Sequence, residues 1–572
     1  MSKDGTPLLL RFLSTSLLPN FFHSSSTMAL VTVSLYLAIA VFAGLVYRLL
    51  QVGKRPKGMP PGPPTMPVVG NLLQLPKENI HEKFREWAQE YGEIYSIMLG
   101  NQRMVVLNSP RVIKDLIDTR SNNYSSRPEM YVGQTLISGG YRLVLMQYDE
   151  GWRLARKMIH NLLNIKTAVE YIPYQELELR QMLFDMVKRP DKYHDHVRRY
   201  STSLVTSIAF GWRSLAYNDP DVRQIYEGFE EFAVASQVSA SILDYFPILR
   251  ALPDWLSPAK RKGKQLHKEE IALYKKYMLK VKERKEKGII AKNFCDDMFK
   301  QQEKVGFSDD WASYVSGTLL EAGSDTTASI FLSFAVAMIN FTEVQKKAQD
   351  EIDRVIGADR LPTMADEMDL QYIRGVVKES LRFLPSSILG IVPHATTNAD
   401  TYNGYEFPAK TGMMINVWTL NNDPERYPEP RKFNPDRYKN DLLRAQESAT
   451  LNDPYQRDHF TFGAGRRVCP GLNIAERSLF LGIAYMLWAF SFEHAVDENG
   501  NKIPVSTEAV TQGIVCRPQP FQYKMVERDP KRTQRVLKAW DNAKELLTKY
   551  PEGIRSTQYV SDWKDFTAKE KF

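Results

Sequence analysis

The amino-acid sequence predicts a mainly α-helical protein with a small β region, preceded by a single membrane-spanning helix. One apolar segment near the N-terminus carries no charged residue, and two long apolar segments, 309–340 and 472–490, follow in the body of the chain. Segments of this length favour helices over strands. The chain of 572 residues suits one large catalytic domain with an extension at each end.

Composition and charge narrow the class of protein. Three cysteines, Cys295, Cys469 and Cys516, lie far apart, so a disulfide framework is excluded and a reducing compartment is expected. The net charge of +8 is spread along the chain without a Lys/Arg-rich block. We therefore expect a membrane surface or an acidic protein as the partner, and no nucleic acid.

The N-terminal region predicts a membrane anchor. Residues 12–47 contain no Asp, Glu, Lys or Arg, and residues 28–50 are long and apolar enough to cross a bilayer, which takes roughly 20 residues. The alternative is a cleaved signal peptide, for which the apolar run is long. Positive charges follow directly and place the downstream domain on the cytosolic side, at Arg48, Lys54, Arg55 and Lys57.

The remaining boundaries follow from composition. Residues 1–27 form an extension, and because Met28 would itself make a conventional start, we expect translation to begin there; a peptide mapped upstream would refute this. Residues 51–67 are basic and proline-rich, which predicts a stiff hinge. Residues 68–524 form the catalytic domain. Residues 525–572 form a charged, helix-prone tail, expected to dock on the body.

Short strands are predicted after the hinge. Ile94–Leu99 and Arg103–Leu107 are rich in strand-forming residues and flank Gly100-Asn101, which predicts a hairpin. Further on, Trp152 and Arg156 lie on one face of a predicted helix, where an indole N–H and a guanidinium reach the same anionic group. The ordinary alternative is an amphipathic surface helix.

A long helix is predicted after the capping residue Ser308, ending near Asn340. Its middle, Ala322-Gly323-Ser324-Asp325-Thr326-Thr327, is polar and helix-weakening. An acid beside hydroxyl groups in an apolar helix indicates proton handling. A satisfied buried polar patch is the alternative.

Three further patterns are weak when taken singly. Glu379 and Arg382 are spaced as a helical ion pair. Arg437 lies in the segment Phe433-Asn434-Pro435-Asp436-Arg437-Tyr438, and His394 follows a proline. A lone histidine is more often a core or surface residue than part of a site.

The most informative segment is Phe462–Gly471, which frames Cys469 with glycines and two arginines just before an apolar helix. Amide donors and the positive end of that helix are expected to lower the thiol pKa, so that the sulfur can act as a metal ligand. Pro470 fits the first helical position. Glycines at 463, 465 and 471 let a flat ligand approach, Arg467 can pair with its carboxylate, and Phe462 packs against the ligand or the loop.

This segment resembles the haem-binding signature of the cytochrome P-450 family. Members of that family use the cysteine thiolate as the proximal ligand of haem iron. The other motifs occur in the family's order, so the resemblance covers about 60–524. It implies a P-450 fold with haem between the Thr326 helix and the Cys469 loop.

The resemblance also implies roles for residues around the haem. Thr326 orders the oxygen-derived ligand and its water, and Asp325 helps to deliver protons. Ala322 and Gly323 leave room above the iron. The cofactor-binding residues implied are Trp152, Arg156, Ala322, Gly323, His394, Phe462, Arg467, Cys469 and Gly471, with Trp152, Arg156 and His394 at the propionates.

A structural role is implied for Glu379, Arg382 and Arg437, which the family joins in a buried network. Asp436 and Tyr438 depart from the commoner Glu and Phe of that motif. The substrate pocket is expected to be lined by 390–394, 511–515 and parts of 127–145. These segments are apolar or small and polar, which favours an apolar, aromatic substrate.

The implied activity is that of a haem-thiolate monooxygenase. Its cofactor is haem b, iron protoporphyrin IX, its co-substrate is O₂, and NADPH supplies electrons through a membrane-bound NADPH–cytochrome P-450 reductase. The expected location is the endoplasmic reticulum membrane, with one span in membrane lipid and the catalytic domain in the cytosol.

The motifs resemble most those of fungal secondary-metabolism members, including Pro393-His394-Ala395-Thr396-Thr397. Two reactions stay open: hydroxylation, which adds one oxygen, and oxidative phenol coupling of a polyketide or coumarin, which gives a biaryl dimer short of two hydrogens. A haem-thiolate isomerase or dehydratase without a reductase, or a haem sensor without turnover, is the alternative class. The Asp325-Thr326 pair argues against both.

Overall fold

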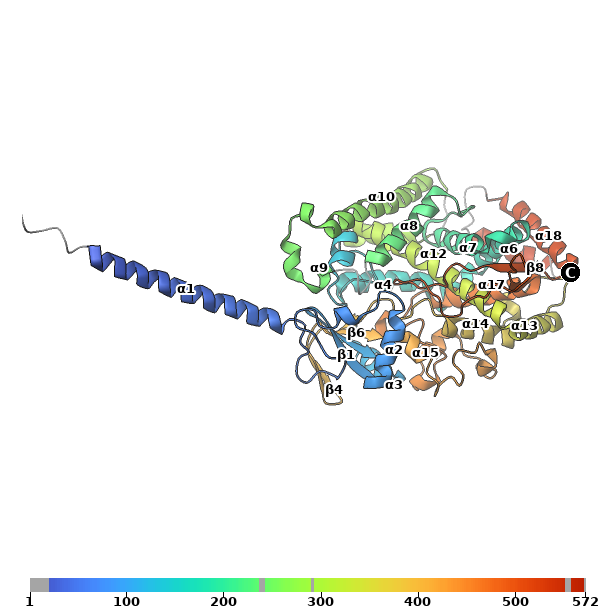
Figure 1. Cartoon of the computed structure of the whole chain (residues 1–572). Helices are drawn as coiled ribbons and strands as arrows, with labels where there is room; N and C mark the ends of the chain where they lie inside the picture. The colour runs from blue at the N-terminus through green and yellow to red at the C-terminus, as the bar shows by residue number, and fades with distance from the viewer. Residues whose placement is uncertain (1–19, 236–241, 290–292, 551–556, 570–572) are drawn as a thin grey trace, which may run out of the picture.

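A computed structural model describes residues 20–235, 242–289, 293–550 and 557–569 (Figure 1). Of the expected extension 1–27, residues 1–19 lie outside this described part. The helices are α1 Asn20–Gln51, α2 Ile80–Tyr91, α3 Pro110–Ile113, α4 Glu150–Leu163, α5 Ile165–Ala168, α6 Ile172–Lys188, α7 Tyr193–Phe210, α8 Pro220–Ala235, α9 Ile242–Tyr245, α10 Pro258–Glu286, α11 Phe294–Val305, α12 Asp309–Asn340, α13 Thr342–Val355, α14 Gln371–Phe383, α15 Val417–Asn421, α16 Ala445–Ala449, α17 Leu472–Ala489, α18 Pro530–Leu547 and α19 Thr557–Lys569. The strands are β1 Ile94–Leu99, β2 Gln102–Leu107, β3 His394–Ala395, β4 Asp400–Tyr402, β5 Tyr405–Phe407, β6 Gly412–Ile415, β7 Phe490–His494 and β8 Tyr523–Glu527.

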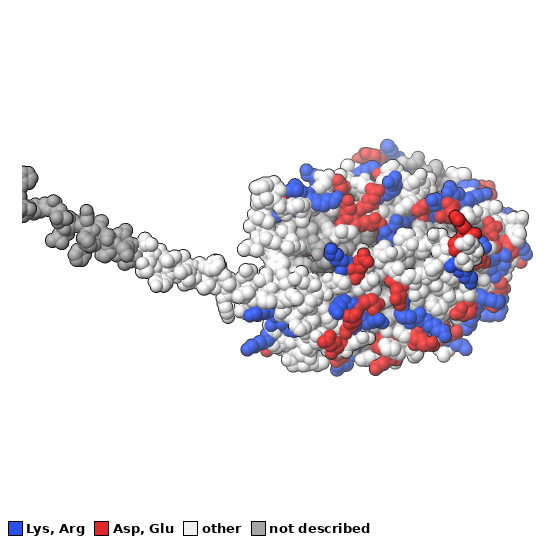
Figure 2. Space-filling model, in the orientation of Figure 1, with Lys and Arg blue, Asp and Glu red and all other residues white. Residues whose placement is uncertain are grey.

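Helix α1 projects away from the rest of the molecule (Figure 1). Residues 31–50 are all exposed, and the helix carries no charged side chain before Arg48 (Figure 2). An exposed apolar helix of this length is a candidate membrane span. Helix α12 is also long and apolar enough, but it is mostly buried within the body. The helix α1 begins at Asn20, before the expected anchor boundary at residue 28.

The predicted hairpin is confirmed. β1 and β2 pair antiparallel, with Ile94 opposite Leu107 and Leu99 opposite Gln102. β6 adds to β2 in parallel, and β3 pairs antiparallel with β6, giving a four-stranded sheet in the order β1-β2-β6-β3. Because β3 begins at His394, the sheet fixes the position of this histidine.

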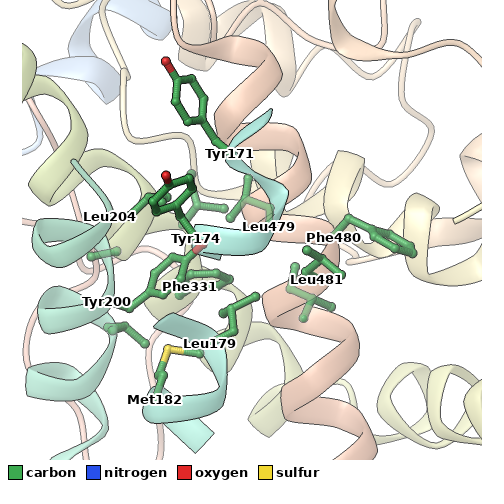
Figure 3. Packing of buried hydrophobic residues seen from close by; sticks show 14 of the residues in the cluster. Tyr171, Tyr174, Leu179, Met182, Tyr200, Leu204, Phe331, Leu479, Phe480 and Leu481 are labelled. Carbon is green, nitrogen blue, oxygen red and sulfur yellow. The ribbon is translucent and has the colours of Figure 1, made fainter. Parts of the chain in front are cut away.

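The core lies where α6, α7, α12 and α17 meet (Figure 3). Tyr200 of α7 and Phe331 of α12 are buried there with their ring centroids 5.8 Å apart, and Leu479 of α17 belongs to the same buried cluster. Helix α12 is buried over most of its length, and its C-terminal half from Ala328 to Ile339 is largely apolar on every side. A Cβ at Gly482 of α17 would lie 2.4 Å from the Phe331 ring, so glycine permits this close helix approach.

The C-terminal tail forms α18 and α19, which pack against α6. Trp540, Tyr559 and Trp563 are buried in this contact. The Trp563 indole N–H donates to Oε2 of Glu176 at 2.6 Å. The tail is thereby part of the main hydrophobic core rather than a solvated appendage.

Candidate functional site

The middle of α12 presents one accessible face. Residues 311–321 are buried, whereas Ala322 is exposed and Thr326 is partly exposed one turn later. Side chains four residues apart share a helix face, so these two residues look out on the same space. The Thr326 hydroxyl donates to the Ala322 carbonyl at 2.8 Å.

Gly323 has a different role from the one expected. A Cβ at Gly323 would lie 2.7 Å from the Val205 side chain of α7. The missing side chain therefore allows α7 and α12 to approach, rather than leaving room above an iron. Ala322 is exposed, and its predicted place above an iron stays a prediction.

Asp325 faces away from Thr326 and is buried in a charge cluster that the sequence did not reveal. Its Oδ1 lies 3.5 Å from Nη2 of Arg198, and its Oδ2 lies 3.3 Å from Nη1 of Arg517. Nη2 of Arg517 also contacts the exposed Glu230 at 2.6 Å. Asp325 and Thr326 thus lie on different faces of α12, and Arg517 links Asp325 to the surface. Neither arginine lies in a recognisable motif.

The cysteine loop is a tight turn stabilised by its own backbone. The Cys469 amide donates to the Phe462 carbonyl at 2.9 Å, so Phe462 supports the loop through its backbone as well as its ring. Gly465 has φ of 64°, and a Cβ there would lie 2.3 Å from the Ile117 carbonyl oxygen. Gly463 also has positive φ, and a Cβ there would meet nothing within 4 Å.

Two expectations about Cys469 are wrong. Burial raises the pKa of the Cys469 thiol, although the backbone amides of Gly471 and Leu472 and the nearby Arg156 oppose the shift. Helix α17 begins at Leu472 with Gly471 as its N-cap, so Pro470 precedes the helix instead of occupying its first position. Partial accessibility still distinguishes Cys469 from the other cysteines, Cys295 and Cys516, which are buried. A bound cation would restore the thiolate.

Beside the cysteine loop lies a cluster of cationic groups without counter-ions. Arg127, Arg156 and Arg467 donate to backbone carbonyls and form no ion pair with any carboxylate of the described residues. Burial lowers the pKa of Arg127 to about 9, and burial together with Arg127 and Arg156 lowers the pKa of Arg467 to about 8. Arg127 was expected only as part of a pocket-lining segment.

The same cluster includes two predicted residues. Trp152 of α4 lies under Arg467, with the guanidinium 4.1 Å from the ring centroid. His394 Nδ1–H donates to the Tyr124 carbonyl at 2.8 Å, and burial and Arg127 lower the pKa of His394 to about 3. Arg156 donates to the Val468 carbonyl of the cysteine loop. The predicted face shared by Trp152 and Arg156 thus adjoins the Cys469 loop.

These residues fit a haem. Arg127 is buried and Arg156 and Arg467 are half-buried, and the three donate to backbone carbonyls that do not balance their charge. Charges withdrawn from water in this way are costly unless an anionic group pairs with them, and two propionates would supply that charge. A dianionic group there would also raise the pKa of His394 and allow its Nε2–H to donate. Cys469 supplies a soft ligand for iron, and the open position at Gly463 admits a flat group.

The predicted structural network is present. Glu379 and Arg382 are both fully buried, and Arg382 Nε and Nη2 each donate to the Glu379 carboxylate at 2.7 Å. Nε of Arg437 lies 3.4 Å from the same carboxylate. Asp436, the departure from the usual motif, is at the surface and pairs with Lys347 at 2.6 Å. The substitution therefore leaves the network intact.

A separate cavity lies between the sheet and the loops that precede β3 and β8. Its lining is largely apolar and includes Ile391 and Pro393 and residues 511–514, which agrees with two of the expected pocket segments. Pro128 and Met130 come from the third segment. Sequence reasoning missed the contribution of β1 and β2, made by Leu99, Gln102 and Met104.

Comparison with known proteins completes the description of the site. The Cytochrome P450 family model matches residues 60–525. The chain is 44% identical to the cytochrome P450 monooxygenase virE of Hypocrea virens, over 91% of this chain and 94% of that protein. It is 42% identical to the cytochrome P450 monooxygenase fogE of Aspergillus ruber, over 94% and 100% of the two chains. It is 41% identical to the cytochrome P450 monooxygenase fsoB of Humicola fuscoatra, over 92% and 98%.

Proposed function

Because this chain belongs to the cytochrome P450 family and has its fold, we propose that it is a membrane-anchored haem-thiolate monooxygenase that oxidises an apolar, aromatic secondary metabolite. Membership of the family implies haem iron and O₂. The main support for the proposal is that a partly accessible cysteine in a tight loop lies beside three guanidiniums that pair with no carboxylate among the described residues. The cysteine can bind a metal, and the guanidiniums can bind the carboxylates of the same cofactor.

The bound haem would supply the activation of O₂. Cys469 would hold its iron, while Arg127, Arg467, Trp152 and His394 would orient its carboxylates. The Thr326 hydroxyl, on the accessible face of α12, would position water near the reacting oxygen.

Proton supply is the role we assign to Asp325. Because Arg517 contacts both Asp325 and the exposed Glu230, the buried carboxylate is connected to solvent through a charged pair. Asp325 must turn from Arg517 toward Thr326 to deliver a proton, since the two residues occupy different faces of α12. The ion pairs with Arg198 and Arg517 hold the carboxylate away from Thr326 until then.

Membrane association is supported by a second apolar feature besides α1. Between residues 242 and 256 five large apolar side chains are exposed: Ile242, Ile248, Leu252, Trp255 and Leu256. This segment lies at the end of the body from which α1 projects (Figure 1). An exposed apolar patch beside an anchor favours contact with lipid. We place the protein in the endoplasmic reticulum membrane with its catalytic domain in the cytosol, where NADPH–cytochrome P-450 reductase would supply electrons.

The lining of the cavity favours an apolar substrate of aromatic character. Leu99, Tyr245 and Met414 contribute to its walls, and Tyr245 belongs to the segment nearest the proposed lipid surface. An apolar metabolite dissolved in lipid could therefore enter at this end. The reaction is either hydroxylation or oxidative phenol coupling, as set out from the sequence.

The decisive experiment tests the thiolate. The full-length protein, reduced and exposed to carbon monoxide, is expected to show the Soret band of a haem-thiolate complex, and Cys469→Ser is expected to abolish it. Cys516→Ser, which removes a buried cysteine of the cavity lining, should retain the band. A normal band in Cys469→Ser would overturn the proposal.

Turnover decides the reaction. Deleting the gene in its host should make a precursor accumulate, and this precursor is then incubated with the protein, reductase and NADPH. A product one oxygen heavier indicates hydroxylation, and a dimer short of two hydrogens indicates coupling. Turnover without NADPH would identify an isomerase or dehydratase instead. Absence of turnover in the presence of the reductase would indicate a haem sensor.

A further inference from the structure

A second cavity lies between α8 and α10, away from the proposed substrate cavity. None of its lining residues lines the substrate cavity. Its apolar walls come from Ile225 and Phe229 of α8 and from Leu266, Leu273 and Tyr274 of α10. These walls suit an aryl or alkyl group of small size.

The charge of this cavity is one-sided. Four glutamates line it, Glu227, Glu231, Glu269 and Glu270, and no Lys, Arg or His does. Figure 2 shows acidic side chains gathered on this part of the surface. Two cations outside the lining pair with glutamates at the exposed rim: Lys262 lies 2.8 Å from Glu231, and Arg223 lies 3.4 Å from Glu227. These exposed pairs compensate only part of the negative charge of the lining.

Glu270 differs from the other three because it is buried. Its Oε2 accepts from Nη2 of Arg142 at 2.6 Å and from the Tyr314 hydroxyl at 3.1 Å. Its Oε1 is buried and has no hydrogen-bond partner among the described residues. A buried carboxylate oxygen without a donor is costly, so a missing donor is indicated.

The surroundings of Glu270 are also short of positive charge. Arg142 is fully buried and is shared between Glu270 and Glu321 of α12, so one guanidinium serves two buried carboxylates. Burial raises the pKa of Glu270 to about 7, with Arg142 opposing and Glu321 adding to the shift. A second cation at Glu270 would complete the charge balance.

We propose that the cavity between α8 and α10 binds a small apolar cation with N–H donors, of the amidinium or ammonium class, whose charged group donates to Oε1 of Glu270. The apolar part of the ligand lies against Phe229 and Leu273, and the rim glutamates attract it from solution. This site is independent of the haem and of the oxidised substrate.

Benzamidinium is a suitable probe, because its planar N–H donors match a carboxylate and it has no basic nitrogen free to bind iron at neutral pH. Isothermal titration calorimetry of the full-length holoprotein should show one saturable site with Kd on the order of 1 mM. Benzamide, the neutral isostere, should bind at least tenfold more weakly. Equal binding of the two would overturn the proposal.

Two variants and one control locate the site. Gly228→Leu fills the cavity from α8, where a Cβ would meet nothing within 4 Å, so the fold should be kept and binding lost. Glu270→Gln should weaken binding at least tenfold. Glu283→Gln removes the same charge from an exposed position of α10 and should bind like the unaltered protein. Undiminished binding by Gly228→Leu, or no saturable binding by the unaltered protein, would refute the proposal.

Discussion

Replacing Trp563 tests whether the C-terminal helix α19 is held by the contacts with α6. The Trp563 side chain is buried, and its indole N–H donates to Glu176 at 2.6 Å. The Arg180 guanidinium also lies 5.1 Å from the ring centroid. Truncation of a buried tryptophan to alanine costs about 3–5 kcal/mol, and all of this acts on α19, since the helix docks through this residue and Tyr559.

A series of substitutions separates packing from hydrogen bonding. Trp563→Phe keeps an aromatic ring but removes the donor to a buried carboxylate, which costs about 1–3 kcal/mol. Trp563→Ala removes both. Because 1.4 kcal/mol is a factor of ten, the equilibrium constant for opening of α19 should rise by roughly 10²–10⁴ in Trp563→Ala and by roughly 5- to 100-fold in Trp563→Phe.

Amide hydrogen exchange measured by mass spectrometry reports this opening directly. Peptides covering α19 should lose some protection in Trp563→Phe and more in Trp563→Ala. Peptides of α12 serve as an internal reference. Lys564→Ala, at an exposed position of the same helix, is the matched control and should leave exchange unchanged. If α19 of Trp563→Ala exchanges no faster than that of Lys564→Ala, the assigned contacts do not hold the tail.

Three other predictions concern the body of the protein. Glu379→Leu leaves Arg382 buried without a carboxylate, so unfolding free energy measured with denaturant should fall by about 3–5 kcal/mol, whereas Asp436→Asn, which breaks a surface pair, should cost less than about 1 kcal/mol. Arg127→Met should speed haem transfer to an apo-globin by roughly tenfold or more, because the charged hydrogen bond proposed between Arg127 and a propionate would be lost; an unchanged rate would contradict the proposed role of this cluster. Burial raises the pKa of Glu476 from 4.5 to about 7, so the folded protein binds the extra proton and thermal stability should fall as pH rises from about 4.5 to about 7. Glu476→Gln should flatten that part of the pH profile, and an identical profile in the variant would refute the assignment.

Local patterns in the sequence predicted the elements that short-range chemistry determines. The hairpin at β1 and β2 depends on strand-forming residues around Gly100, and both strands form as expected. Ser308 caps α12 by accepting from the Trp311 amide at 3.2 Å. The loop around Cys469 requires its glycines, as the approach of Gly465 to Ile117 demonstrates. The hairpin and the helix cap need only neighbouring residues, so the sequence is sufficient for them, whereas the contact that requires Gly465 comes from the distant Ile117.

The sequence was less informative about the direction in which a side chain faces. Asp325 and Thr326 are adjacent in the chain, yet consecutive positions on a helix point to different sides, and Asp325 meets Arg198 and Arg517 instead. Gly323 serves the packing of α7 for the same reason. The pKa of Cys469 depends on how deeply the loop is buried, and burial outweighs the amide donors that the sequence suggested.

The sequence by itself determined the family, and it predicted the cysteine ligand and the candidate membrane anchor, because each is encoded in contiguous residues whose chemistry does not depend on the rest of the chain. Only the tertiary structure decided the cation cluster of Arg127, Arg156 and Arg467 and the burial of Trp563 in the core. These groups are far apart in the chain and act together only after packing removes them from water. Removal from water makes an unpaired charge costly, and it makes the burial of an indole stabilising.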